Sequence, residues 1–141
     1  MTQFTLPPSL DDIEAIANRQ LAELPDAFRR HLGDILFRIQ DFPDDETVDA
    51  LELDSPFDLM GLYHGVDMSR KSVADPTPGI DMIYLYRRPL LDYWCETEED
   101  FEHLVRHVLI HEIGHHFGLS DEDMHAIEDA AEADDAAEET P

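Results

Sequence analysis

The chain has 141 residues, with 34 Asp and Glu against 9 Lys and Arg, and a net charge of −25 at pH 7. A negative field of this size repels nucleic-acid phosphates and anionic lipids, which argues against both kinds of partner. The length suits one domain, and the single cysteine, Cys95, rules out a disulfide framework and a cysteine-based zinc site. We expect Cys95 to be buried. No signal-peptide pattern or membrane-length apolar run is visible, so we expect a cytoplasmic protein. We also expect a monomer.

Helical and strand-like patterns alternate in the first part of the chain. Ser9 is a good N-cap, and apolar residues at helical spacing predict a helix that ends near Leu24. A short helix between Pro25 and Gly33 follows. Residues 35–40 alternate between apolar and polar side chains, which predicts a half-buried strand. Acidic residues then open a third helix, at about 44–53.

The middle of the chain holds two more predicted strands around a loop. Residues 59–64 form a short apolar run before a glycine, and residues 80–86 alternate and are rich in β-forming side chains. Between them, residues 66–79 show no clear period, which predicts a loop that could carry binding groups. A short helix is expected from Pro89 to Trp94.

The most apolar helix is predicted to begin at a Thr97 cap and to end near Phe117. A last helix follows from Asp121 to about residue 131. Residues 132–141 are acidic and rich in alanine, so we expect a disordered tail. The sequence therefore predicts a single domain over residues 1–131.

The main helix carries the pattern His111-Glu112-x-x-His115. An α-helix turns by about 100° and rises about 1.5 Å per residue, so the two histidines lie one above the other. Two imidazoles at this spacing can bind one zinc ion. Glu112 points away from that metal yet lies close enough to act as general base on a zinc-bound water.

The pattern continues past the helix with Gly118 and Asp121. Glycine readily adopts the positive φ that ends many helices, after which the chain can double back and bring Asp121 to the metal. Catalytic zinc commonly has three protein ligands and an open position for water. Glu122 is the alternative third ligand, and Ser120 or Asp121 could instead cap the last helix.

The full pattern, HExxHxxGxxD, resembles the zincin signature in its metzincin-like form, with Asp in place of the usual third His. Over roughly residues 57–124 the chain is similar to small bacterial zincin-like metallopeptidases, the minimal zincins. The resemblance rests on residues 59–65, 83–91 and above all 111–124. It implies an α+β zincin-like fold, in which a small mixed β-sheet packs on a central active-site helix. It also implies metal-binding roles for His111 and His115 and a catalytic role for Glu112.

Other polar residues have competing interpretations. His103 and His107 continue the four-residue histidine series, but the series drifts by about 40° per step, so we expect both at the surface, with His107 alternatively near the metal. Three tyrosines could stabilise an oxyanion or simply be core aromatics. They are Tyr63, Tyr84 and Tyr86. Arg87 and Arg88 are expected to pair with acidic groups.

Together these features predict a zinc-dependent hydrolase, with Zn²⁺ on His111, His115 and Asp121 and with Glu112 as general base. The first candidate is a metallopeptidase whose peptide or protein substrate adds as a strand along residues 59–64 or 80–86. The alternatives are a non-catalytic metal-binding module that contacts another protein, and a zinc hydrolase of a non-peptide amide or ester.

Overall fold

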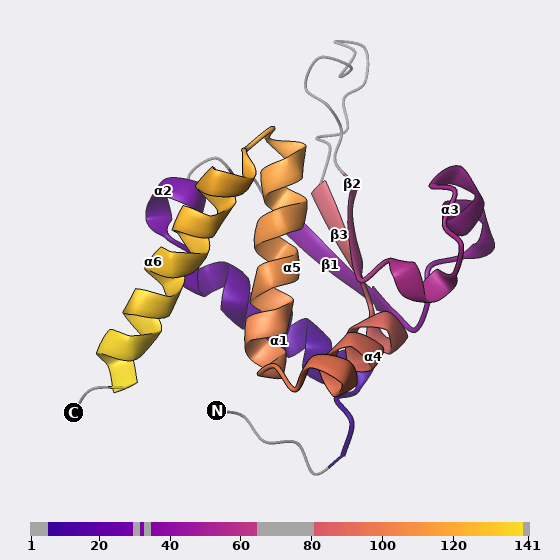
Figure 1. Ribbon diagram of the computed structural model, residues 1–141, viewed down its shortest axis with the longest axis horizontal. Helices are drawn as coiled ribbons and strands as arrows, with labels where there is room; N and C mark the ends of the chain where they lie inside the picture. The colour runs from indigo at the N-terminus through magenta and orange to yellow at the C-terminus, as the bar shows by residue number, and fades with distance from the viewer. Residues whose placement is uncertain (1–5, 30–31, 33–34, 65–80, 140–141) are drawn as a thin grey trace.

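The computed structural model describes residues 6–29, 32, 35–64 and 81–139 (Figure 1). The loop predicted at 66–79 lies outside these residues. The helices and strands are α1 (Leu10–Glu23), α2 (Asp26–Arg29), β1 (Ile35–Gln40), α3 (Asp45–Ala50), the 3₁₀ helix η1 (Pro56–Asp58), β2 (Gly61–His64), β3 (Asp81–Tyr86), α4 (Arg87–Thr97), α5 (Phe101–His116) and α6 (Asp121–Glu139).

The described strands form one mixed sheet in the order β1-β3-β2. β3 runs parallel to β1, with Ile35 opposite Asp81, and antiparallel to β2, with Gly61 opposite Leu85. This arrangement confirms the predicted α+β fold with a small mixed sheet. It also shows that one of the two predicted substrate edges is wrong, because β3 has a neighbour on each side. Of those two strands, β2 is the one that has a strand on one side only among the described residues.

Two helices cover one face of this sheet. α1 packs over β1, α5 packs over β2, and the two helices pack against each other (Figure 1). Ile83 and Leu85 of β3 are fully buried in the same cluster as Leu104 and Leu109 of α5. Each such side chain contributes roughly 1.5–3 kcal/mol when it leaves water. The helix that carries the histidines is therefore the central element of the core, as its high content of apolar residues predicted.

The capping hydrogen bonds show where the helices begin and end, and they confirm one predicted cap and correct another. Ser9 caps α1 as predicted, in a capping box with Asp12. The predicted Thr97 cap of α5 is wrong, because the Asp100 side chain accepts from the Glu102 N–H at 2.9 Å and so begins the helix. Thr97 instead ends α4, where its hydroxyl donates to the Tyr93 carbonyl oxygen.

The chain reverses direction between α5 and α6. Gly118 has φ +72°, as predicted, and the Leu119 N–H donates to the Gly114 carbonyl oxygen at 2.8 Å. Ser120 then caps α6, since its hydroxyl oxygen accepts from the Asp123 N–H at 3.1 Å. This tight turn lays α6 back along α5, which is its main packing partner.

We expect Gly118→Ala to lower the free energy of unfolding by about 1 kcal/mol, because a side chain at positive φ is strained. A Cβ at this position would meet no atom within 4 Å in the described structure, so strain of the backbone is the expected cause. Gly118→Asn is the matched control, because asparagine tolerates this conformation better. Urea denaturation of the three proteins measures the difference, and equal losses for Ala and Asn would contradict this explanation.

The last helix and the single cysteine differ from what the sequence predicted. The predicted end of the last helix near Ala131 is wrong, because α6 continues to Glu139 and so includes most of the segment expected to be disordered. The separation of residues 132–141 from the domain stays a prediction. Cys95 is exposed, which corrects the expectation of burial. Within the described ranges, no helix combines the length and apolarity needed to cross a membrane.

Candidate active site

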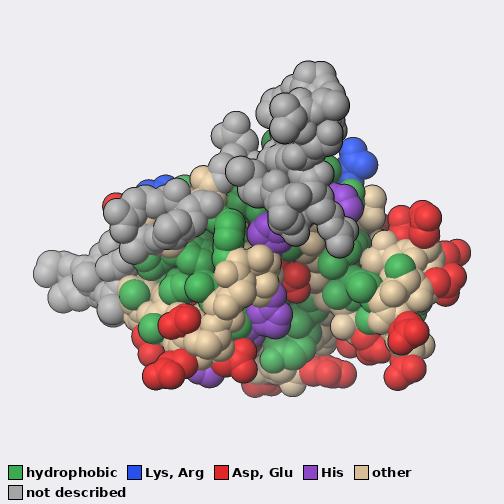
Figure 2. All heavy atoms as spheres, turned by 90° about the horizontal axis from the view of Figure 1, so that it is seen from above, with side chains coloured by type: hydrophobic (Ala, Val, Ile, Leu, Met, Phe, Trp, Pro, Cys, Tyr) green, Lys and Arg blue, Asp and Glu red, His purple; other side chains and the backbone are tan. Residues whose placement is uncertain are grey.

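The candidate site lies along one side of α5. His107, His111 and His115 follow each other at four-residue spacing, with ring centroids 4.1 Å apart for the first pair and 6.2 Å apart for the second. Figure 2 shows histidine side chains that reach the surface near the middle of one face, with acidic side chains toward its two ends. The helical spacing thus gathers imidazoles in a strongly acidic protein.

Glu112 points from α5 toward the edge strand. One of its carboxylate oxygens accepts a hydrogen bond from the backbone N–H of Tyr63 in β2, at 3.2 Å. Burial raises the pKa of Glu112 above its ordinary value of 4.5, although this bond and the nearby charge of His115 oppose the rise. A carboxylate with a raised pKa is a better proton acceptor near neutral pH.

A close approach between β2 and α5 makes this contact possible. A Cβ added at Gly61 would lie only 2.7 Å from a methyl group of Val108, so a side chain there would push the strand away from the helix. Two residues later, Tyr63 faces the same side and stacks on His116, with ring centroids 4.0 Å apart. Gly61 therefore helps to bring the Tyr63 N–H within reach of Glu112.

Of the three tyrosines, Tyr63 alone is bonded to Glu112 in the described structure, and it is bonded through its backbone. Its hydroxyl donates to Asp81 at 2.6 Å, and burial raises its pKa. Tyr86 is only 2% exposed, and burial raises its pKa to about 12. Tyr84 alternates along β3 with the buried Ile83, so it faces the other side of the sheet from α5. Tyr84 and Tyr86 are therefore poorly placed to contact a substrate.

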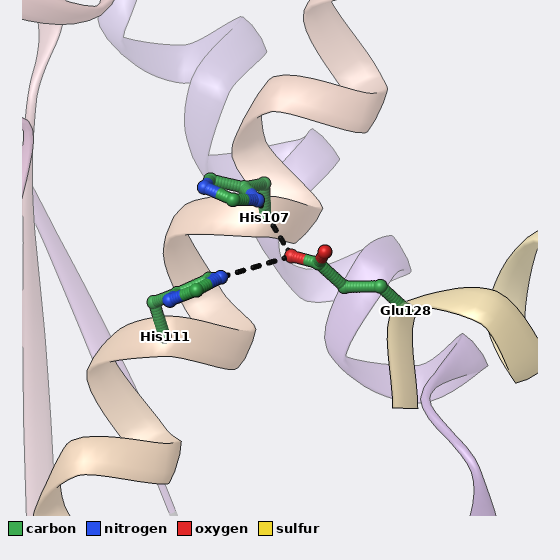
Figure 3. A group of neighbouring side chains, drawn as sticks. All are labelled: His107, His111 and Glu128. Carbon is green, nitrogen blue, oxygen red and sulfur yellow. Dashed lines mark ion pairs between the residues drawn. The ribbon is translucent and has the colours of Figure 1, made fainter. Parts of the chain in front are cut away.

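On the side of α5 that faces α6, away from Glu112 and β2, two histidines lie next to a carboxylate of α6 (Figure 3). The same oxygen of Glu128 lies 2.5 Å from His107 Nδ1 and 3.2 Å from His111 Nε2. Burial and, next, the charge of His107 lower the pKa of His111. A lowered pKa favours the neutral imidazole, which is the form that binds metals.

The predicted ligands are not all gathered in the structure. Among the described His, Cys, Asp and Glu side chains, the group whose ligand atoms lie within 4.8 Å of one another is His107, His111 and Glu128. His115 and Asp121 are exposed and lie outside this group. His107, expected at the surface or alternatively near the metal, is half-buried and paired with Glu128.

Glu128 was missed by the sequence reasoning. The spacing of His107 and His111 was visible, but no motif links them to a residue in α6. Arg87, by contrast, has the structural role that was expected, because it pairs with Asp41 and donates to the Pro8 carbonyl oxygen.

The raised pKa of Glu112 leads to a prediction for the metal-free protein. A carboxyl group with a higher pKa in the folded state makes stability fall as pH rises through the interval between its unfolded and folded pKa values. Glu112→Gln removes this penalty. In excess chelator we expect the variant to have a higher melting temperature than the wild type at pH 8. We expect this difference in melting temperature to be smaller at pH 5. A difference that is equal at both pH values, or that reverses, would contradict the burial of a charged carboxylate.

Comparison with known proteins gives the family. A family model described as zincin-like metallopeptidase matches residues 32–131, which include every helix and strand from β1 to α5. The chain belongs to the zincin-like metallopeptidase family. No curated protein matches the chain.

Membership of this family implies zinc, and the donors on α5 and α6 fit that metal. His111 Nε2 and Glu128 Oε1 are buried, and within the described structure they make the ion-pair contacts shown in Figure 3 but no hydrogen bond of good geometry. Imidazole nitrogens and carboxylate oxygens are the usual donors of catalytic zinc sites. The family's metal therefore has suitable ligands here, centred on His111.

Proposed function

We propose that the protein is a zinc-dependent metallopeptidase in which Glu112 is the general base. The observation that carries this proposal is the environment of Glu112, a half-buried carboxylate of raised pKa held by the Tyr63 N–H of β2, which is an edge strand among the described residues. In the family pattern, this glutamate sits directly after the first histidine ligand. The position and the proton affinity of Glu112 both suit the role.

The proposed catalytic ligands are His111, His115 and Asp121. The half-buried His111 would anchor the metal, and the exposed side chain of His115 would turn toward it. Ser120 caps α6, which leaves the Asp121 carboxylate out of the cap. When bound, zinc would acidify a water molecule and polarise the substrate carbonyl.

Glu112 would take a proton from the attacking water and pass it to the leaving amine. The backbone bond from Tyr63 would hold the carboxylate in place during both transfers. An extended peptide paired with the side of β2 that faces away from β3 would run past Glu112, because Tyr63 belongs to that strand. Peptides are therefore the first substrate class to test.

The test is incubation of the zinc-loaded protein with a mixed peptide library, followed by mass spectrometry of the products. We expect cleavage that a chelator stops and added zinc restores. Cleavage of small amides or esters, but not of peptides, would favour the alternative hydrolase. Metal binding without turnover of any of these substrates would favour the non-catalytic module.

The third ligand has its own prediction. We expect Asp121→Ala to lower kcat/KM for a cleaved peptide by at least about tenfold, a loss of the size seen when groups around a metal are removed. It should also change the absorption spectrum of the cobalt-substituted protein. Glu122→Ala is the matched control, because Glu122 is the next residue and also exposed. If Glu122→Ala has these effects and Asp121→Ala does not, Glu122 is the ligand.

A further inference from the structure

We propose that His107, His111 and Glu128 form a second position for a divalent metal ion. This position shares His111 with the proposed catalytic ligands, so the inference rests in part on the proposed function. The ion would move between a catalytic position and a position beside α6 where it cannot serve catalysis.

The distances suit a metal after small adjustments. Ligand atoms bound to tetrahedral zinc at about 2.0–2.1 Å lie about 3.3 Å from one another. His111 Nε2 and Glu128 Oε1 are 3.2 Å apart. His107 Nδ1 and the same oxygen are 2.5 Å apart, so this pair would open by less than 1 Å. These shifts are within the reach of side-chain rotation.

The environment also favours an ion over an ordinary ion pair. An ion pair accounts for the contact between His107 and Glu128. It leaves the buried His111 Nε2 without a hydrogen bond in the described structure, 3.2 Å from the same Glu128 oxygen that pairs with His107. Unsatisfied buried polar atoms are costly and rare. One metal ion would bind His111 Nε2 together with His107 Nδ1 and the oxygen that they share.

The helix places this ion away from the general base. At about 100° per residue, the direction midway between His107 and His111 lies about 120° around α5 from Glu112. The direction midway between His111 and His115 lies only about 80° from it. Glu112 also bonds to β2, whereas Glu128 comes from α6. An ion held by Glu128 would therefore lie on a side of α5 that Glu112 does not face.

Because both positions use His111, a metal ion in one position prevents a second ion from binding in the other. His111 Nε2 can bind one ion at a time, so the protein should bind one ion per chain in total. Loss of a ligand that belongs to one set only should shift the ion to the other set.

The experiment uses the full-length chain with His115→Ala, which removes a ligand of the catalytic set alone. Zinc affinity is measured by competition with a chromophoric chelator, and ligand geometry by the absorption of bound Co²⁺. We expect His115→Ala to retain one ion per chain. Adding Glu128→Gln should then weaken zinc binding at least tenfold, and so should adding His107→Ala. Asp129→Asn, an exposed neighbour on α6, is the matched control and should change nothing.

Circular dichroism of each variant shows that it is folded before the metal measurements are compared. The proposal is overturned if His115→Ala binds no ion, if the ion it binds is indifferent to Glu128 and His107, or if the wild type binds two ions. If Glu128→Gln alone releases the ion, with His115 intact, the new position is supported and the proposed catalytic ligands are wrong. If metal binding follows the expected pattern but no peptide is cleaved, the proposed function fails and this inference stands.

Discussion

Glu112→Gln is expected to leave zinc bound and to lower kcat for peptide hydrolysis by roughly 10²–10⁴-fold, the range that a positioned general base contributes. Glutamine has nearly the same shape, and its carbonyl oxygen can still accept the Tyr63 N–H that Glu112 accepts in the structure. It cannot take a proton from water at neutral pH. The loss should therefore appear in turnover, with the fold and the metal site retained.

Steady-state kinetics on one cleaved peptide, with zinc content measured on the same samples, provide the test. Glu96→Gln is the matched control, because it makes the same chemical change on an exposed part of α4. Turnover by Glu112→Gln equal to that of the control would remove Glu112 from the role of base. A loss of zinc along with activity would point to a metal ligand instead.

Met124→Ala is expected to cost about 2–5 kcal/mol of stability, the usual range for a large apolar side chain removed from a core. Met124 is 1% exposed and packs from α6 against α5 near the C-terminal end of that helix. A Cβ added at Gly114 would lie 2.5 Å from the Met124 sulfur, so the absence of a side chain at Gly114 lets the two helices meet. Gly114→Val should in turn cost about 1–3 kcal/mol through overpacking.

A double-mutant cycle tests this packing directly. If the two residues fill the same space, Gly114→Val combined with Met124→Ala should cost less than the sum of the single changes. Urea denaturation of the four proteins gives the coupling free energy. Strict additivity would show that some other contact holds α6 against α5.

Local patterns in the sequence predicted most of the fold. Ser9, the alternation in residues 35–40 and the glycine at 118 act on neighbouring residues, so their effects can be read along the chain. The order of the strands could not be read in this way. β3 is the central strand because β1 pairs with one of its sides and β2 with the other. The pairing of β1 with β3 joins residues that lie far apart in the sequence, so no local pattern reveals it.

In the candidate site, too, the features set by neighbouring residues could be predicted and those set by distant contacts could not. His111, Glu112 and His115 are close in sequence, and the helix alone fixes their relative directions. The bond from Tyr63 to Glu112 and the approach of Glu128 to His111 depend on how β2 and α6 pack against α5. Helix geometry gives the direction of His107 on α5, but it does not reveal that α6 brings the Glu128 carboxylate to that side chain.

The different burial of α5 and α6 has a consequence for hydrogen exchange. α5 is packed against α1, α4, α6 and β2, so most of its amide protons should exchange only when the whole domain unfolds. α6 packs mainly on α5, and a local opening of this helix would expose its amides at a lower free energy. Such an opening would carry Glu128 away while His107 and His111 stay fixed. An ion held by Glu128 should therefore slow the exchange of the α6 amides, because this opening would break one of the bonds to the ion.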